Sequence, residues 1–281
     1  MKRTAGGPAV LLGTLAATGM CCTFDPSGIP GATENSIHGI DASNPDNAAD
    51  AGVAPVDAST PEEPPGTTWA ELAGVEVDGS FGEWASAAWT VFDHRTAAHA
   101  DLYSRSYSPS VRVQFAARSS SSELFLAFIV SDNDVVVDSD RIWDDDSIEV
   151  YLDLAGDASG LYGDDDHLLI LRADGRCLSA LRQFPTVKCV AVPWSSGYGI
   201  EASVSWEELR AGYSPGKTIG FGVGVNDDDR LPTDRDAQSP VDAYYGWFDS
   251  SRQPCKECCR DWEHPEPWCD TSRLGTLILS R

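Results

Sequence analysis

WDDDSIEVYLDL, residues 143–154, joins a run of three aspartates to a strand pattern. From Ser147 to Leu154 polar and apolar residues alternate, and successive side chains of a strand point to opposite faces of a sheet. One face is apolar and is expected to enter a core; it carries Ile148, Val150, Leu152 and Leu154. The other face is expected to point outward; it carries Ser147, Glu149, Tyr151 and Asp153. The stretch therefore predicts a strand with one buried face.

Strand patterns recur along the rest of the chain, and helical patterns are scarce. The candidate strands are residues 111–116, 124–130, 167–172, 176–181, 187–192, 199–204, 218–225, 243–248 and 275–279. Short strands separated by Gly, Asp, Ser and Pro turns are typical of all-β sandwiches and barrels. One short helix is expected after Ser205, because Ser205 and Glu208 have capping-box spacing and Gly212 can end the helix. The predicted fold is an antiparallel β-sandwich with one short helix.

The composition supports a folded domain and excludes two classes of partner. The chain has 281 residues, of which 42% are hydrophobic, which is enough for a substantial core. Its formal net charge is −24. Phosphate-rich surfaces would be repelled by this charge, so nucleic acids and anionic membrane surfaces are not expected partners.

Residues 1–22 have the layout of an export signal. Lys2 and Arg3 precede an apolar run over residues 9–17, and Cys21 and Cys22 follow it. The apolar run is too short to span a membrane. Because a cysteine at this place can be the lipid-attachment site of a bacterial lipoprotein, the sequence predicts a cell-surface lipoprotein or a secreted protein. The membrane would be a partner only through such a lipid anchor.

Residues 23–66 differ in composition from the rest of the chain. They are rich in Pro, Ala, Gly, Ser and Asp and contain no Lys or Arg. Such a composition predicts a disordered, self-repelling acidic linker. The folded domain is therefore expected over residues 67–281.

The cysteines beyond the linker are expected to form disulfides, which are the default in an oxidising compartment. They are Cys177, Cys189, Cys255, Cys258, Cys259 and Cys269. Cys177 and Cys189 flank a tight loop between two strand patterns and are expected to face each other across a hairpin. The tail CKECCRDWEHPEPWC, residues 255–269, has a second interpretation, because its Cys-x-x-Cys together with Cys269 and His264 offers ligands to zinc.

The order of several short motifs resembles a known family. The motifs are VDGSFGEW (77–84), VRVQFAARSSSSELFLAFIVSDND (111–134), WDDDSIEVYLDL (143–154), GIEASVSWEEL (199–209), GKTIGFGVGVNDDD (216–229) and LGTLILS (274–280). In this order they resemble the family 9 carbohydrate-binding modules, relatives of the DOMON domains, across nearly all of residues 67–281. The resemblance implies an immunoglobulin- or DOMON-like sandwich that binds sugars or oligosaccharide ends outside the cell.

The resemblance also implies a binding site, in which two tryptophans sandwich a sugar ring. The matching positions are Trp143 and Trp247, with Glu149 and Arg172 as polar groups. Tyr245 would share a strand face with Trp247. Gly224 stands where the family strand carries an amide, which removes a polar group from the expected sugar face.

The residues themselves allow two interpretations of this site. Aromatic rings suit the C–H faces of sugars, and carboxylates accept hydrogen bonds from hydroxyls. The alternative is structural: Trp143 would close one end of the sandwich, and Glu149 would pair with Arg172 across neighbouring strands. Both interpretations stay open on the sequence alone.

Three aspartate runs, at residues 144–146, 164–166 and 227–229, suggest metal binding. Ca²⁺ prefers several carboxylate and carbonyl oxygens, although solvated turns have the same composition. The candidate ligands of a structural Ca²⁺ are Asp132, Asp134, Asp144 and Asp146. No organic cofactor is expected.

Catalysis is the alternative to binding, with glycoside hydrolysis as the reaction. Glu149 and Asp153 lie four residues apart on one strand, about 13 Å by strand rise. That exceeds the roughly 5 to 9.5 Å that separates such catalytic pairs, so no catalytic residue is assigned. Haem binding through Met, known in some DOMON relatives, is not expected because Met1 and Met20 both lie in the export signal.

Overall fold

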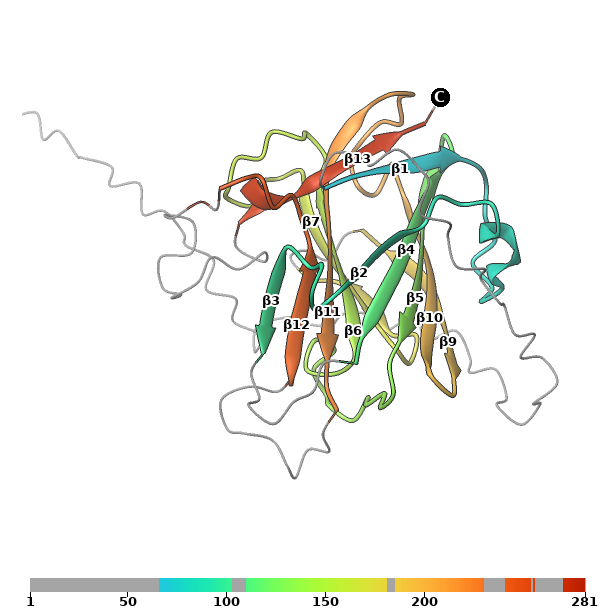
Figure 1. Ribbon diagram of the computed structural model, residues 1–281. Helices are drawn as coiled ribbons and strands as arrows, with labels where there is room; N and C mark the ends of the chain where they lie inside the picture. Colours follow the sequence, from blue (N-terminus) through green and yellow to red (C-terminus); the bar gives the residue numbers. More distant parts are fainter. Residues whose placement is uncertain are drawn as a thin grey trace, which may run out of the picture.

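The computed structural model describes residues 66–102, 110–180, 185–229, 241–253, 255 and 270–280. The predicted export signal and residues 23–65 of the predicted linker lie outside this part of the chain. None of the helices in the described part is long and apolar enough to cross a membrane. The described residues form an almost purely β-structure (Figure 1).

From residue 112 onward the strands lie where the sequence patterns predict them, and the three strands before that residue were not predicted. They are β1 (Thr67–Leu72), β2 (Thr90–Asp93), β3 (His99–Leu102), β4 (Arg112–Ser119), β5 (Glu123–Ser131), β6 (Ser147–Asp153), β7 (Asp166–Arg172), β8 (Cys177–Ser179), β9 (Val187–Trp194), β10 (Gly197–Ser205), β11 (Thr218–Asp227), β12 (Ala243–Trp247) and β13 (Gly275–Leu279). Two short 3-10 helices, η3 (Phe81–Trp84) and η6 (Thr271–Arg273), accompany them. In the region of the expected helix, residues 206–210 form hydrogen-bonded turns, where Ser205 Oγ accepts the Glu208 N–H at 3.1 Å.

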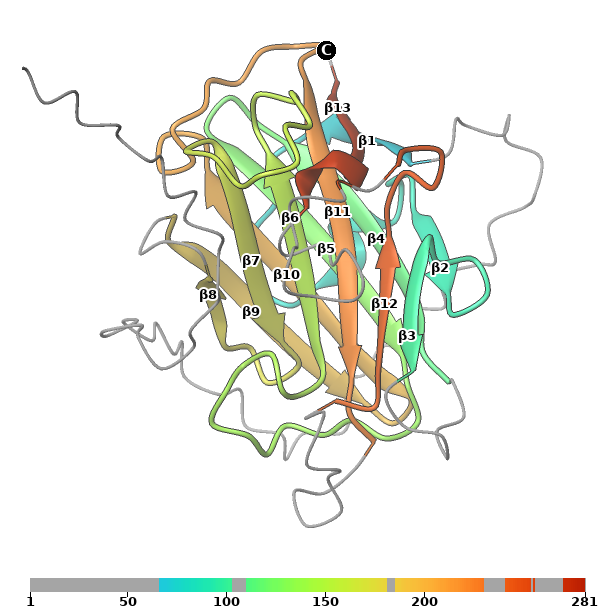
Figure 2. The same ribbon diagram turned by 90° about the vertical axis from the view of Figure 1, so that its left-hand side faces the viewer.

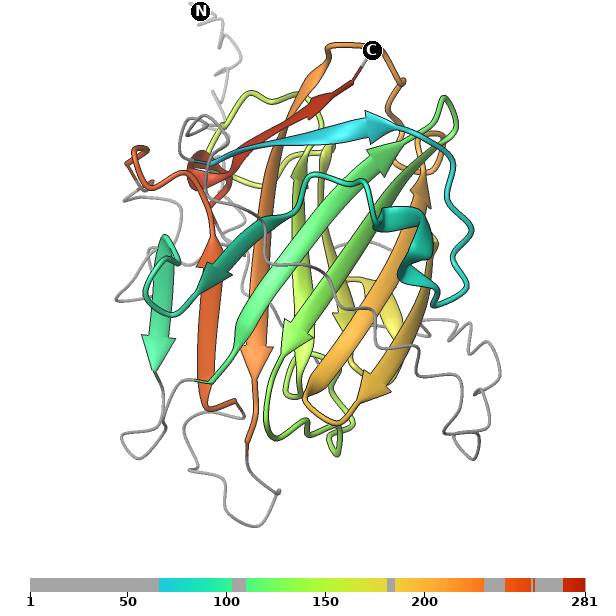
Figure 3. The same ribbon diagram turned by 45° about the vertical axis from the view of Figure 1, so that its right-hand side comes forward.

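The strands form two layers that are joined at one end. The first layer runs β8-β7-β6-β11-β12-β3, and the second runs β2-β4-β5-β10-β9. Figure 2 looks onto the first layer, with β5 and β4 of the second layer behind it. β13 pairs with β11, and β1 lies between β13 and β4, so the sheet continues from one layer to the other (Figure 3). The predicted β-sandwich is confirmed; β1 alone runs parallel to its two partners, β13 and β4.

A disulfide joins the two layers at the opposite end of the sheet order. Cys177 lies on β8 and Cys189 on β9, which are the edge strands of the first and second layers. Their Cα atoms are 6.3 Å apart. The predicted pairing is therefore confirmed, but β8 and β9 do not form the expected hairpin, because each is hydrogen-bonded to a strand of its own layer. The disulfide links the edges of the two layers, so that the sheet is nearly closed.

The main core lies between the layers, and β6 shows how it is built. Ile148, Val150, Leu152 and Leu154 all enter this core, as their alternation predicts. They meet residues of the second layer such as Phe115 and Phe128. The opposite face of β6, which carries Glu149 and Tyr151, forms part of what we call the outer face of the first layer. This face is also buried, so the prediction of a single buried face is wrong: neighbouring side chains cover it.

The motif VDGSFGEW covers the outer face of the second layer. Trp84 is buried against Phe125, and its Nε1 donates to Glu201 Oε1 at 2.6 Å. The backbone N–H groups of Asp78 and Gly79 donate to Glu201 Oε2 at 3.2 and 2.7 Å. Burial raises the pKa of Glu201, and these hydrogen bonds oppose that rise. The motif thus fastens the start of the domain onto β10.

Candidate functional site

The outer face of the first layer carries an apolar cluster with a polar centre. The buried apolar residues are Ile142, Tyr151, Leu168, Ile170, Ala180, Tyr244, Phe248 and Leu274. Trp143 is half-buried and packs against this cluster from the loop that precedes β6. Glu149, on β6, is 7% exposed. The sequence-predicted Trp143 and Glu149 therefore belong to one side of the first layer.

Both carboxylate oxygens of Glu149 are held by neighbours. Asn226 on β11 donates from Nδ2 to Glu149 Oε1 at 3.0 Å. The Tyr151 hydroxyl donates to Glu149 Oε2. Burial, and then the negative charge of Glu149, raise the pKa of Tyr151 well above its usual value, so this phenol stays protonated as a donor. The carboxylate is fixed in orientation by donors from two adjacent strands.

Arg172 belongs to a different network from the one expected. On β7 it lies opposite Ser147, and its side chain reaches the loop before β6. It forms ion pairs with Asp145 and Asp174 and donates from Nη1 to the Ser139 carbonyl at 2.8 Å. Arg172 thus braces the loop that carries Trp143.

The structure does not bring Trp247 and Tyr245 to the side of Trp143. On β12 these two residues face the core between the layers, and Trp247 lies 5.1 Å from Phe115 between ring centroids. The intervening Tyr244 instead faces outward and packs in the cluster with Trp143. Alternation correctly paired Tyr245 with Trp247 on one face, but that face is the inner one.

Glu149 and Asp153, the pair considered for catalysis, lie in separate hydrogen-bond networks. Asp153 accepts the backbone N–H groups of Gly156 and Ala158, at 2.7 and 2.9 Å, and so shapes the turn after β6. No catalytic role is assigned to either carboxylate.

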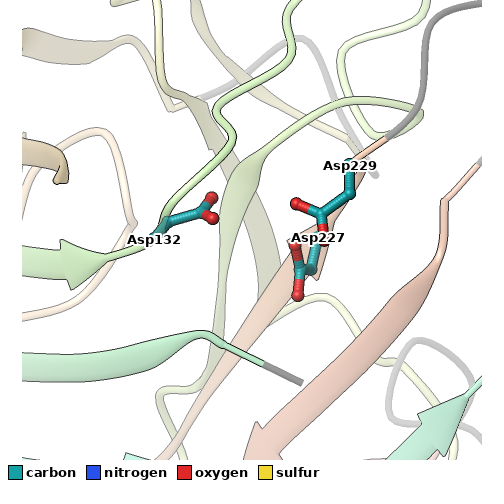
Figure 4. A group of neighbouring side chains, drawn as sticks. All are labelled: Asp132, Asp227 and Asp229. Carbon is teal, nitrogen blue, oxygen red and sulfur yellow. The ribbon is translucent and has the colours of Figure 1, made fainter. Parts of the chain in front are cut away.

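A second cluster, the acidic end cluster, consists of Asp132, Asp227 and Asp229. Asp132 follows β5, Asp227 ends β11, and Asp229 lies two residues further on; their carboxylate oxygens, one from each, lie within 4.8 Å of one another (Figure 4). Asp132 and Asp227 are buried, at 4% and 0% exposure. Asp132 Oδ2 and Asp229 Oδ1 are buried and accept no hydrogen bond from the described part of the chain. Oxygen atoms aimed into one space without donors are the arrangement that a cation requires.

Burial and the negative charges of neighbouring carboxylates raise the pKa values of the acidic end cluster. Burial, and then the charges of Asp229, Asp242 and Asp228, raise the pKa of Asp227 to about 8. Burial, and then the charge of Asp132, raise the pKa of Asp229 to about 6. Burial also raises the pKa of Asp132. This environment disfavours the charged form of Asp227 near neutral pH.

Three of the four sequence-predicted metal ligands lie in or beside the acidic end cluster, and Asp144 does not. Asp132 belongs to the acidic end cluster, and Asp134 is exposed beside it. Asp144 pairs with Arg141 at 2.7 Å. Asp146 accepts the Val136 N–H at 2.6 Å and lies beside Asp132: burial, and then the charge of Asp132, raise the pKa of Asp146 well above its usual value. The other two members of the cluster come from the aspartate run at 227–229, which the sequence shows plainly but does not connect to Asp132.

The remaining cysteines are only partly within the described residues. Cys255 is disulfide-bonded, which takes its thiolate away from the zinc interpretation. Cys258, Cys259, Cys269 and His264 lie outside the described residues.

Comparison with known families agrees with this architecture. A family model described as "Carbohydrate family 9 binding domain-like" matches residues 77–281, well over half of the chain. The chain belongs to the family 9 carbohydrate-binding modules. The resemblance inferred from the order of the motifs is therefore confirmed.

Solved structures and curated sequences give relatives of this module. A family 9 module from Caldicellulosiruptor kristjanssonii has been solved with cellotriose and with glucose. Each of these structures has a TM-score of 0.59 and 17% identity, covering 76% of this chain and 93% or 96% of the other. At this identity the likeness shows the fold.

Two curated relatives are enzymes of much greater length. Endo-1,4-beta-xylanase A of Thermotoga neapolitana is 32% identical over 109 residues, 37% of this chain and 10% of the enzyme. The same enzyme of Thermotoga maritima is 29% identical over 109 residues. The chain thus covers about a tenth of the length of these curated relatives.

Proposed function

We propose that this module binds the ends of sugar chains at the edge of the outer face of the first layer, with Trp143 as the apolar wall and Glu149 as the hydrogen-bonding group. The observation that carries this proposal is that half-buried Trp143 packs against the cluster whose polar members orient the Glu149 carboxylate. An indole face suits the C–H face of a sugar ring, and an oriented carboxylate accepts hydroxyl hydrogen bonds. Membership of the family supports sugar binding as the activity.

The sugar class is proposed from the relatives. Structures of the family 9 module from Caldicellulosiruptor contain cellotriose and glucose, and the matched enzymes are named xylanases. We therefore propose β-linked glucose or xylose oligosaccharides as ligands, with glucose as the smallest. Trp247 is left out of the site because its ring packs against Phe115 and Phe221 between the layers.

Isothermal titration with glucose, cellotriose and xylotriose tests this proposal. Trp143→Ala should abolish binding while the circular dichroism spectrum stays unchanged. Trp69→Ala is the matched control, since Trp69 on β1 is 40% exposed and lies outside the cluster. Absence of wild-type binding to all three sugars, or full binding by Trp143→Ala, would contradict the proposed site.

We also propose that the acidic end cluster holds a structural Ca²⁺ through Asp132, Asp227 and Asp229. The donors are all oxygen, as Ca²⁺ prefers, and two of them, Asp132 Oδ2 and Asp229 Oδ1, are buried and accept no hydrogen bond from the described residues. After EDTA treatment, titration with CaCl₂ should give a site that Asp227→Asn removes. Glu76→Gln removes one exposed charge elsewhere and should leave that site intact.

Export to an oxidising compartment is the proposed location. The Cys177–Cys189 disulfide supports it, because disulfides persist mainly outside the cytosol. Mass spectrometry of the native protein's N-terminus separates a lipidated cysteine at position 21 or 22 from plain secretion. An intact, unprocessed N-terminus would contradict export.

A further inference from the structure

The Tyr244 ring lies directly on Gly224. Gly224 is on the outward side of β11, opposite Glu149 on β6 and Gly246 on β12. A Cβ atom at Gly224 would lie 2.2 Å from the Tyr244 hydroxyl oxygen and 2.7 Å from two ring carbons. The absent side chain is therefore what allows a phenol from β12 to reach across β11 toward β6.

The Tyr244 hydroxyl continues the hydrogen-bond network of Glu149. Its oxygen lies 3.1 Å from the Tyr151 hydroxyl oxygen. Each phenol has one proton, and Tyr151 gives its proton to Glu149. Tyr244 is consequently the donor to Tyr151, and the chain of donors runs Tyr244 to Tyr151 to Glu149.

This network is almost completely removed from water. Tyr151 is 0% exposed, Tyr244 is 1% exposed and Asn226 is 5% exposed. Hydrogen bonds in such surroundings are stronger than in water and polarise one another along a chain. Removal of the Tyr244 hydroxyl should therefore weaken the hydrogen bond from Tyr151 to Glu149, the last acceptor of the network.

We infer that Tyr244 is a positioning residue for sugar binding. Its ring fills the space above Gly224, and its hydroxyl orients Glu149 through Tyr151. The inference rests on the proposed function at Trp143 and Glu149. The sequence suggested that Gly224 leaves the sugar face short of a polar group. The Tyr244 hydroxyl occupies that place, so the pair Gly224 and Tyr244 replaces a single polar side chain on β11.

Isothermal titration of the full chain with glucose and with cellotriose tests this role. Tyr244→Phe keeps the ring over Gly224 and removes only the hydroxyl. Its affinity for both sugars should fall about five-fold, the value of one net hydrogen bond. A purely structural role for Tyr244 predicts unchanged affinity, because the packing of the ring is retained.

A double-mutant cycle tests the same inference from the other partner. Gly224→Ala forces the Tyr244 ring to move and should lower affinity about ten-fold. In a Tyr244→Ala background the same change should alter affinity by less than about two-fold. Gly212→Ala is the control: a Cβ atom there would meet nothing within 4 Å, so affinity should stay within about two-fold of wild type.

The outcomes separate this inference from the proposed function. Wild-type binding combined with unchanged affinity in Tyr244→Phe, or equal effects of Gly224→Ala in both backgrounds, would overturn the inference and leave the function standing. Absence of wild-type binding would overturn the function and the inference with it.

Discussion

Without the proposed Ca²⁺, the stability of this module should fall as pH rises, and the acidic end cluster sets the size of the effect. The pKa of Asp227 is raised to about 8 from its usual 3.8 by burial and neighbouring carboxylates. In the ion-free protein the native state therefore binds a proton that the unfolded state releases near pH 4. Stability is full below pH 4 and is lost as pH rises toward 8, by about 1.4 kcal/mol per pH unit for this one group.

Binding of the proposed Ca²⁺ should offset this loss of stability, because the ion binds the ionised carboxylates. For a domain of this size about 1 kcal/mol corresponds to about 2–4 °C in Tm. The ion-free Tm should therefore fall by about 5–10 °C between pH 5.5 and pH 7.5. Calcium at a hundred times its Kd adds about 2.7 kcal/mol, again about 5–10 °C, and this gain should appear at pH 7.5 and be small at pH 5.5.

Differential scanning calorimetry in EDTA and in CaCl₂, at pH 5.5 and pH 7.5, measures the change of Tm with pH and with calcium. Asp227→Asn, which cannot ionise, should flatten the pH dependence in EDTA and lose the response to calcium. Glu76→Gln should behave as wild type, since Glu76 is exposed and outside the cluster. A Tm in EDTA that does not change with pH, or an equal calcium response at both pH values, would refute the reasoning.

Two further predictions concern the ends and the second layer of the sandwich. Replacing Cys177 and Cys189 by serine should lower the free energy of unfolding, measured by urea denaturation, by about 3 kcal/mol, the value expected for a loop with a sequence separation of 12. A loss below about 0.5 kcal/mol would show that other contacts hold the two edges together. Trp84→Phe should lower the free energy of unfolding by about 2 kcal/mol, because it removes the hydrogen bond to Glu201. Sugar affinity should stay unchanged, since Trp84 lies on the outer face of the second layer. A drop in sugar affinity would place part of the site on that face.

The sequence predicted the fold because period-2 alternation is a local property. Ile148, Val150, Leu152 and Leu154 enter the core as expected. Cys177 and Cys189 pair because β8 and β9, the edge strands of the two layers, come together. Where both faces of a strand are apolar, alternation sorts side chains into two sets without saying which set is inside. In β12 this left the sides of Tyr245 and Trp247 undecided, and packing against Phe115 places them in the core.

The site depends on distances between strands that are remote in sequence, which the sequence does not supply. Asp132 and Asp227 meet because the ends of β5 and β11 come together across the sandwich, 95 positions apart in the chain. Tyr244 meets Gly224 because the register of β12 against β11 lets its ring lean over a residue that has no side chain. The sequence by itself determined most of the strands, the core face of β6 and the family, all of which follow from local patterns and their order. The tertiary structure decided which aspartates share a cluster and which aromatic residue stands beside Glu149, because strand register and layer packing fix both.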